Sequence, residues 1–107
     1  MTKYPMTEVM ARREYQYSGP PSPQRVVAAI GRPAPMPDAP YGDWYCPYVL
    51  EAPGGRRESY AGGVDGLQAL LLALSALKAD LELLQGKGKL TFLDDEDLGI
   101  HLVGGAA

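Results

Sequence analysis

The stretch that decides the fold is residues 64–85, VDGLQALLLALSALKADLELLQ. Leucines recur in it at spacings of three and four, which places them along one face of an α-helix. They are Leu67, Leu70, Leu74, Leu77, Leu81 and Leu84. About 20 residues with a rise of 1.5 Å each make a rod roughly 30 Å long. One such helix covers one face of a sheet, so the rest of the chain is expected to be arranged around it.

Both ends of this helix carry sequence signals. Asp65 is a favourable N-cap residue, and Gln68 three positions later completes a capping-box pattern. Val64 before the cap is expected to pack as a hydrophobic staple. Gly86 after the last turn is expected to end the helix in a left-handed conformation.

Three leucines are not needed for contact with a sheet. Leu71 falls near the polar stripe of the helix, and Leu72 and Leu83 lie on the other flank of that stripe. Three interpretations are open for these leucines. Loops cover them, or they are ordinary exposed leucines, or they form a surface for self-association or for a partner. Spare leucines on both flanks favour a core helix over a two-stranded zipper.

The remaining segments are predicted to be strands. Alternating, β-branched or aromatic residues mark residues 8–17, 24–30, 44–52, 56–61 and 89–93. Pro47 cannot donate to a ladder, which predicts an edge position or a bulge. The proline-rich residues 31–43 predict an extended, solvent-facing connection. The order ββββαβ with short links predicts an α+β, two-layer domain, in which an antiparallel meander of four to five strands carries one helix on one face.

Alternation along these strands predicts two unlike sheet faces. The face against the helix is expected to hold Val9, Ala11, Tyr15, Val26, Ala28, Ile30, Trp44, Cys46, Tyr48, Leu50, Leu90 and Phe92. The other face is expected to hold Met10, Arg12, Glu14, Arg25, Val27, Tyr45, Val49, Glu51, Thr91 and Leu93. This second face mixes apolar and charged groups, which suits a moderately polar protein contact.

Length and composition predict one domain, because 107 residues suffice for a single core. We expect it over residues 8–102, with a flexible tail at 1–7 and a disordered tail at 103–107. Lys78, Asp80 and Glu82 argue against a membrane span. The first twenty residues are charged and lack the apolar region of a signal peptide, and a cytoplasmic location is the simplest expectation.

No candidate motif for catalysis, metal binding or cofactor binding has the residues that its chemistry requires. The sequence therefore favours a non-enzymatic protein, and no cofactor is assigned. Cys46 is the single cysteine and His101 the single histidine; no known nucleophile motif surrounds either, which favours an inert, buried thiol. The acidic residues 94–99 lack a bidentate ligand at the twelfth position of a calcium loop. The glycine-rich residues 86–89 follow a helix, whereas a phosphate loop precedes one.

The strand half of the chain is rich in tyrosine and arginine, which are typical of protein-binding hot spots. The acidic net charge of −3 and the absence of an RNA-binding motif favour protein over nucleic acid, with single-stranded RNA as a weaker hypothesis. The first hypothesis is therefore a protein-interaction module, an accessory or immunity-type partner of a larger protein or a homodimer. The expected surface comprises Leu71, Leu72, Leu83, Arg12, Tyr45 and Val49.

A second hypothesis is a small-molecule binder or enzyme. Its pocket would lie between residues 31–43 and the start of the helix. The residues expected to line it are Trp44, Tyr48, Asp65 and Gln68.

Two segments taken together, DWYCPY at residues 43–48 and GVDGLQAL at residues 63–70, with Gly-Arg-Pro at 31–33, carry a resemblance. They resemble a family of short bacterial proteins of unknown function, over roughly residues 8–102. The resemblance implies a compact bacterial domain and transfers no catalytic residues.

Overall fold

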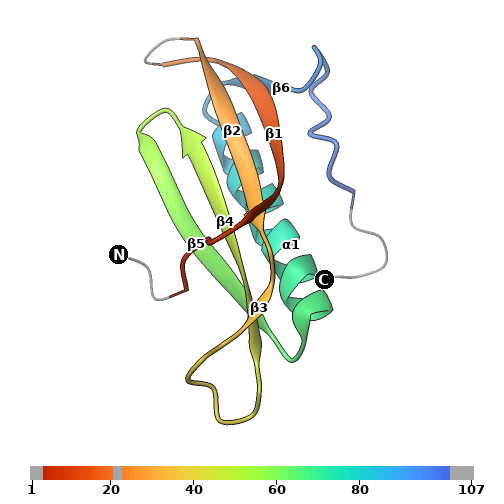
Figure 1. Cartoon of the computed structure of the whole chain (residues 1–107). Helices are drawn as coiled ribbons and strands as arrows, with labels where there is room; N and C mark the ends of the chain where they lie inside the picture. Colours follow the sequence, from red (N-terminus) through yellow and green to blue (C-terminus); the bar gives the residue numbers. More distant parts are fainter. Residues whose placement is uncertain (1–3, 21–22, 102–107) are drawn as a thin grey trace.

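The computed structural model describes residues 4–20 and 23–101. Within them, six strands form one antiparallel sheet and a single helix packs on it, which confirms the α+β class. The strands are β1 Val9–Ser18, β2 Gln24–Gly31, β3 Ala34–Pro35, β4 Trp44–Ala52, β5 Gly55–Gly63 and β6 Lys89–Thr91, and the helix is α1 Gly66–Gln85. Figure 1 views the sheet from one face, with α1 behind it.

The sheet is a meander, as expected. β1, β2, β4 and β5 are neighbours in that order, and after the helix β6 returns to pair with residues 16–18 at the outer edge of β1. The expected connection over residues 31–43 contains the short strand β3, which continues the line of β2 along the same edge of β4. Pro47 is therefore not on an edge strand. It lies where β4 has stopped pairing with β2 and has not begun to pair with β3, in a gap between two ladders.

The start of α1 follows the capping prediction, and its end does not. The Asp65 carboxylate accepts the Gln68 backbone N–H at 2.8 Å, and the Gln68 side chain accepts the Val64 backbone N–H at 2.8 Å. The Val64 side chain is 70% exposed and is no staple. Gly86 has a right-handed backbone (φ −71°) and donates to Glu82, so the helix ends without the expected left-handed cap.

The buried face of α1 is rotated from the leucine stripe. Its buried residues are Ala69, Ala73, Leu77, Leu81 and Leu84, whereas Leu67 is 65% exposed. The cause is a close approach at the first turn, where a Cβ on Gly63 would lie 2.6 Å from the Ala69 backbone nitrogen. Only small side chains fit beneath the helix at that distance. The alanines therefore face the sheet there and Leu67 is turned outward.

The helix packs mainly over β4 and β5, with few contacts to β2. Tyr15, Val26, Ile30, Cys46 and Leu90 are among the buried core residues, as alternation predicted, and Trp44 and Phe92 pack against them half-buried. Val9 (55% exposed) and Ala11 were expected in this core but are exposed. The helix does not cover the start of β1, and the pairing register shifts between these two residues.

The N-terminal segment covers part of the opposite face. Tyr4, which lies in the expected flexible tail, is only 7% exposed, and its ring contacts Tyr45 and Tyr60 with centroids 4.9 and 4.8 Å away. Its hydroxyl donates to Asp38 at 2.7 Å. Figure 1 shows the segment crossing in front of the sheet. The expected tails at residues 1–3 and 103–107 lie outside the described residues.

Candidate functional site

The three spare leucines lie on two different sides of α1. Leu83 is 67% exposed and lines a hollow of about 340 Å³ beside β5, together with Arg57 and Asp80. Leu72, 40% exposed, lies eleven residues earlier, three turns up the same side. Leu71, 41% exposed, lies on the side of Leu74, away from β5. The side of α1 next to β5 thus carries two of the three leucines.

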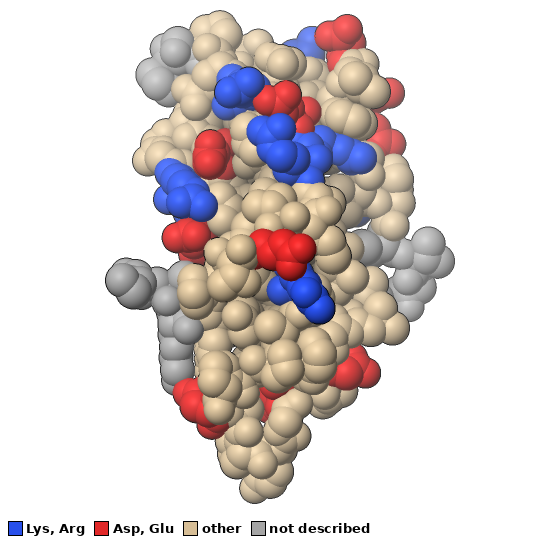
Figure 2. Space-filling model, viewed as in Figure 1, with Lys and Arg blue, Asp and Glu red and all other residues tan. Residues whose placement is uncertain are grey.

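The rest of the expected interaction surface is smaller than the sequence indicated. Tyr45 is 8% exposed and Val49 is 4% exposed, so both are buried on the face where Tyr4 and Met6 lie. Arg12 is exposed beside Glu14, which also pairs with Arg25 at 2.9 Å. Figure 2 shows basic and acidic side chains interspersed over the upper part of this face. Such mixed charge differs from the dense basic patch of a phosphate-binding surface.

The four residues of the expected pocket are only partly brought together. The Trp44 ring lies at the start of α1, where a Cβ on Gly66 would meet it at 3.2 Å. Asp65 and Gln68 are bonded in the cap and are exposed. Tyr48 is buried four positions along β4 from Trp44. The aromatic ring thus packs against the helix start, and the two polar groups are engaged in capping.

A different hollow opens between α1 and the strands that the helix leaves uncovered. It has a volume of about 340 Å³ and is bounded by β1, β2, α1 and residues 99–101. Its lining is mainly apolar and includes Tyr15, Ala28, Ile30, Leu74, Leu77 and Ile100. Arg12, Arg13 and His101 also line it and are its polar components. We call this hollow the apolar groove.

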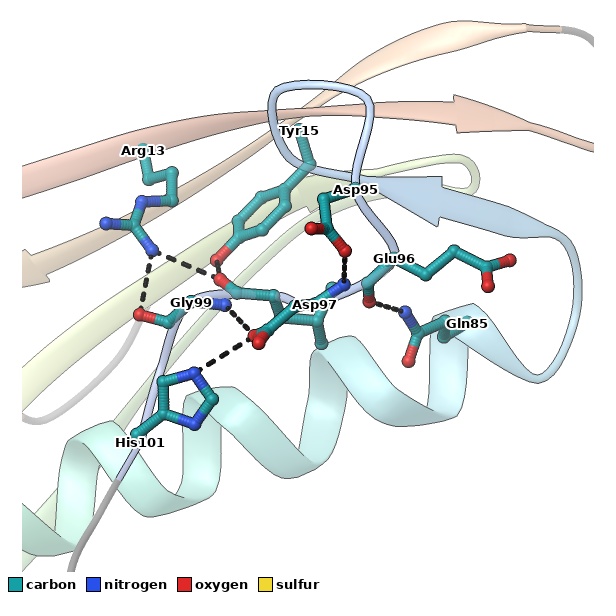
Figure 3. Close-up of polar contacts among 9 residues, drawn as sticks. Arg13, Tyr15, Gln85, Asp95, Glu96, Asp97, Gly99 and His101 are labelled. Carbon is teal, nitrogen blue, oxygen red and sulfur yellow. Dashed lines mark hydrogen bonds and ion pairs between the residues drawn. The ribbon is translucent and has the colours of Figure 1, made fainter.

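The segment that bounds the apolar groove is held by a defined set of contacts (Figure 3). The Tyr15 hydroxyl donates to the Leu98 carbonyl at 2.9 Å, in a buried hydrogen bond. Arg13 donates to the carbonyls of Leu98 and Gly99, each at 3.1 Å, and its guanidinium lies 4.1 Å from the centre of the Phe92 ring. Burial raises the pKa of Tyr15, partly offset by Arg13. The phenol therefore stays protonated as a donor near neutral pH.

The acidic run forms a turn that satisfies its own backbone. Phe92 and Asp95 exchange two backbone hydrogen bonds across a tight turn, in which Leu93 and Asp94 have positive φ angles of 53° and 65°. Asp97 accepts the Gly99 N–H at 2.8 Å and lies 3.1 Å from His101. The Gly99 bond, with a further contribution from His101, lowers the pKa of Asp97. Within residues 4–20 and 23–101, no group of His, Cys, Asp and Glu has the geometry of a metal site.

The cysteine is placed as an inert core residue. Cys46 is fully buried, and its thiol donates to the Gly31 carbonyl at 3.4 Å. Burial raises the pKa of this thiol to about 11. A nucleophilic cysteine requires a depressed pKa and an accessible thiolate, and this residue has neither.

The comparisons with known proteins identify a family. A family model described as a domain of unknown function, DUF6968, matches residues 11–102. The chain belongs to this family. The resemblance to an uncharacterised family is thereby confirmed. Neither the curated proteins nor the solved structures gave a significant match. No residue role is therefore transferred from a relative.

Two features of these sites were missed from the sequence. The alternation of residues 8–17 placed Tyr15 in the core without indicating that its hydroxyl binds the chain more than eighty residues later. Arg13 interrupted the apolar face of the same strand, and that interruption was the available signal. A charged residue on a buried face is stable only with partners, and here backbone carbonyls of the C-terminal segment provide them.

Proposed function

We propose that this protein is a non-enzymatic protein-interaction module located in the cytoplasm. The observation that carries the proposal is the pair Leu72 and Leu83, exposed on the side of α1 that faces β5, whose outer edge pairs with no other described strand. An exposed apolar stripe beside an open strand edge combines two common modes of protein recognition.

The chemistry of the described residues supports an interaction role over catalysis. The thiol of Cys46 is buried and protonated, and the Asp65 carboxylate is engaged in capping. Asp97 and His101 pair with each other on an exposed turn. No helix among the described residues is long and apolar enough to span a membrane. The cytoplasmic location is supported by the single, unpaired cysteine, which suits a reducing compartment.

The interaction surface is tested by affinity purification from the source cells. Tagged protein is compared with the double variant Leu72→Ser/Leu83→Ser and with Leu71→Ser, which changes an equally exposed leucine on the other side of α1. We expect a protein bound in stoichiometric amount, either a second copy or a different chain, with the unmodified protein and with Leu71→Ser but not with the double variant. A bound protein that the double variant retains, or no bound protein at all, would refute the proposal.

A second candidate function is the binding of a small apolar molecule. The apolar groove favours it, because its volume of about 340 Å³ and mainly apolar lining resemble small-molecule sites. This position differs from the pocket expected at Trp44. A thermal-shift series with apolar molecules tests it, since a ligand that binds only the folded state raises the melting temperature with concentration. Leu74→Glu, which places a charge in the groove, should remove any such shift.

A further inference from the structure

We infer that the partner of the α1–β5 side is a second copy of this chain, joined through antiparallel pairing of β5 with β5 across a two-fold axis. The inference rests on the proposed interaction function and names its partner. It assigns three parts to the interface: the outer edge of β5, the charges of Arg56 and Glu58, and one side of α1.

The first observation is the open edge of β5. All nine residues of β5 pair with β4, and no other described strand lies on its outer side. The strand stands at the margin of the sheet in Figure 1. Every second residue of an edge strand directs its N–H and C=O outward, and these groups are a template for another strand. The edge of β1 is less open, because β6 occupies part of it and Arg13 holds the C-terminal segment nearby.

The second observation is a seam on α1 above this edge. Leu72, Ala76, Ala79 and Leu83 follow one another at spacings of four, three and four, which places them along one side of the helix. Leu83 lines a hollow with Arg56 and Arg57, so this side is the one next to β5. Small residues between two leucines allow two helices to approach closely.

The third observation is that the seam and the strand share a midpoint. The Arg57–Asp80 ion pair shows that residue 57 of β5 lies beside residue 80 of α1. The close approach of Gly63 to Ala69 shows that residue 63 lies beside residue 69. The middle of the seam lies between residues 77 and 78 of α1. Interpolation between these two contacts, with rises of about 3.3 Å per strand residue and 1.5 Å per helix residue, places that middle beside about residue 58 of β5. A two-fold axis through Glu58 therefore brings Leu72 opposite Leu83 of the second copy.

The spacing of the helices agrees with this axis, and Arg56 and Glu58 of both copies form a mixed-charge cluster around it. Arg56 pairs with Glu58 of its own strand at 3.4 Å. An axis at Glu58 sets the two Glu58 side chains opposite each other and places an Arg56 of the other copy diagonally across from each of them. Because α1 lies over β4 and β5, its axis is about 5 Å from the two-fold axis, given strands about 4.8 Å apart. The two helices would then be about 10 Å apart, the usual distance for packed helices.

The test is sedimentation equilibrium from low to high micromolar concentration. We expect the unmodified protein to be a dimer, and Arg56→Glu and Glu58→Arg each to weaken it by about tenfold or more, because each variant leaves side chains of only one sign of charge around the axis. An equimolar mixture of the two variants should form a heterodimer, visible by native mass spectrometry. Leu83→Glu should be monomeric, whereas Leu71→Glu, on the other side of α1, should remain a dimer.

Disulfide cross-linking provides a second test of the β5 interface that does not depend on the charge and leucine variants folding well. Glu58→Cys should form a disulfide-linked dimer, because the axis places the two substituted residues opposite each other and the native thiol is buried. Glu82→Cys, exposed on the outside of α1, should not cross-link. A monomer at high micromolar concentration, or a dimer unaffected by all three β5-side variants, overturns the inference. The proposed function survives either result if the purified protein retains a different chain through Leu72 and Leu83.

Discussion

Replacing Arg13 with alanine should release the C-terminal segment from the sheet. The change removes two hydrogen bonds to the carbonyls of Leu98 and Gly99 and the contact with the Phe92 ring. Leu98 keeps the hydrogen bond from Tyr15, so its carbonyl is not left unpaired. The two hydrogen bonds together contribute about 1 kcal/mol at this half-buried position, and the cation–π contact contributes about 0.5–1 kcal/mol.

The expected loss of about 2 kcal/mol corresponds to a fall in melting temperature on the order of 10 °C for a domain of this size. Urea unfolding followed by circular dichroism measures the loss of free energy, and limited proteolysis should show faster cleavage within residues 93–101. The matched control is Arg12→Ala, which removes an exposed ion pair of 3.6 Å worth less than about 0.5 kcal/mol. Equal stability losses in the two variants would refute the role of Arg13 as an anchor.

Three further predictions concern the core and the titratable groups. Leu81→Ala should destabilise the protein by about 2–5 kcal/mol in urea unfolding, because Leu81 is fully buried, whereas Leu71→Ala, which lies outside the proposed interface, should cost less than about 1 kcal/mol; similar values would show that the helix is oriented differently. Cys46, with its pKa raised to about 11, should resist iodoacetamide at pH 8 until the protein unfolds, so rapid alkylation of the native protein would contradict its burial. The lowered pKa of Asp97 means that its carboxylate stabilises the fold above the unfolded pKa of about 3.9 and loses this effect as the pH falls. The melting temperature of Asp97→Ala should therefore lie below that of the unmodified protein at pH 7 and approach it in acid, and a difference independent of pH would rule out the charge as the cause.

Local patterns predicted the elements and their order. The pair Asp65 and Gln68 marked the helix start, because the cap is formed within four residues. Alternation placed Val26, Ala28 and Ile30 in the core, because a strand that faces a helix buries every second residue. Both signals depend on neighbours in the sequence.

The parts that were wrong depend on contacts between distant residues. The burial of Tyr45 depends on Tyr4, forty-one positions earlier, and no periodicity within either segment records that contact. The rotation of α1 depends on the close approach of Gly63, which favours Ala69 and Ala73 over the larger Leu67. A leucine stripe indicates which side of a helix is apolar, and side-chain volume at the contact decides which residues touch the sheet.

The same limit applies to the candidate site. The sequence separated Leu72 and Leu83 from the main stripe without deciding whether they are covered, and in the structure both are exposed. It gave no indication that both face β5, since that depends on which strands lie under the helix. It placed a pocket at Trp44, whereas the apolar groove lies where the helix leaves β1 and β2 uncovered.

The most direct test of the β5 interface is amide hydrogen exchange of β5, measured at low and at high protein concentration. Exchange is slow where an amide is hydrogen-bonded in a stable structure and fast at an open edge. If β5 pairs with β5 of a second copy, its outward-facing amides, every second residue from 56 to 62, should become protected as the concentration rises. The outer edge of β1 over residues 9–14 should show no such change. Outward-facing amides of β5 that exchange equally fast at both concentrations would contradict the interface.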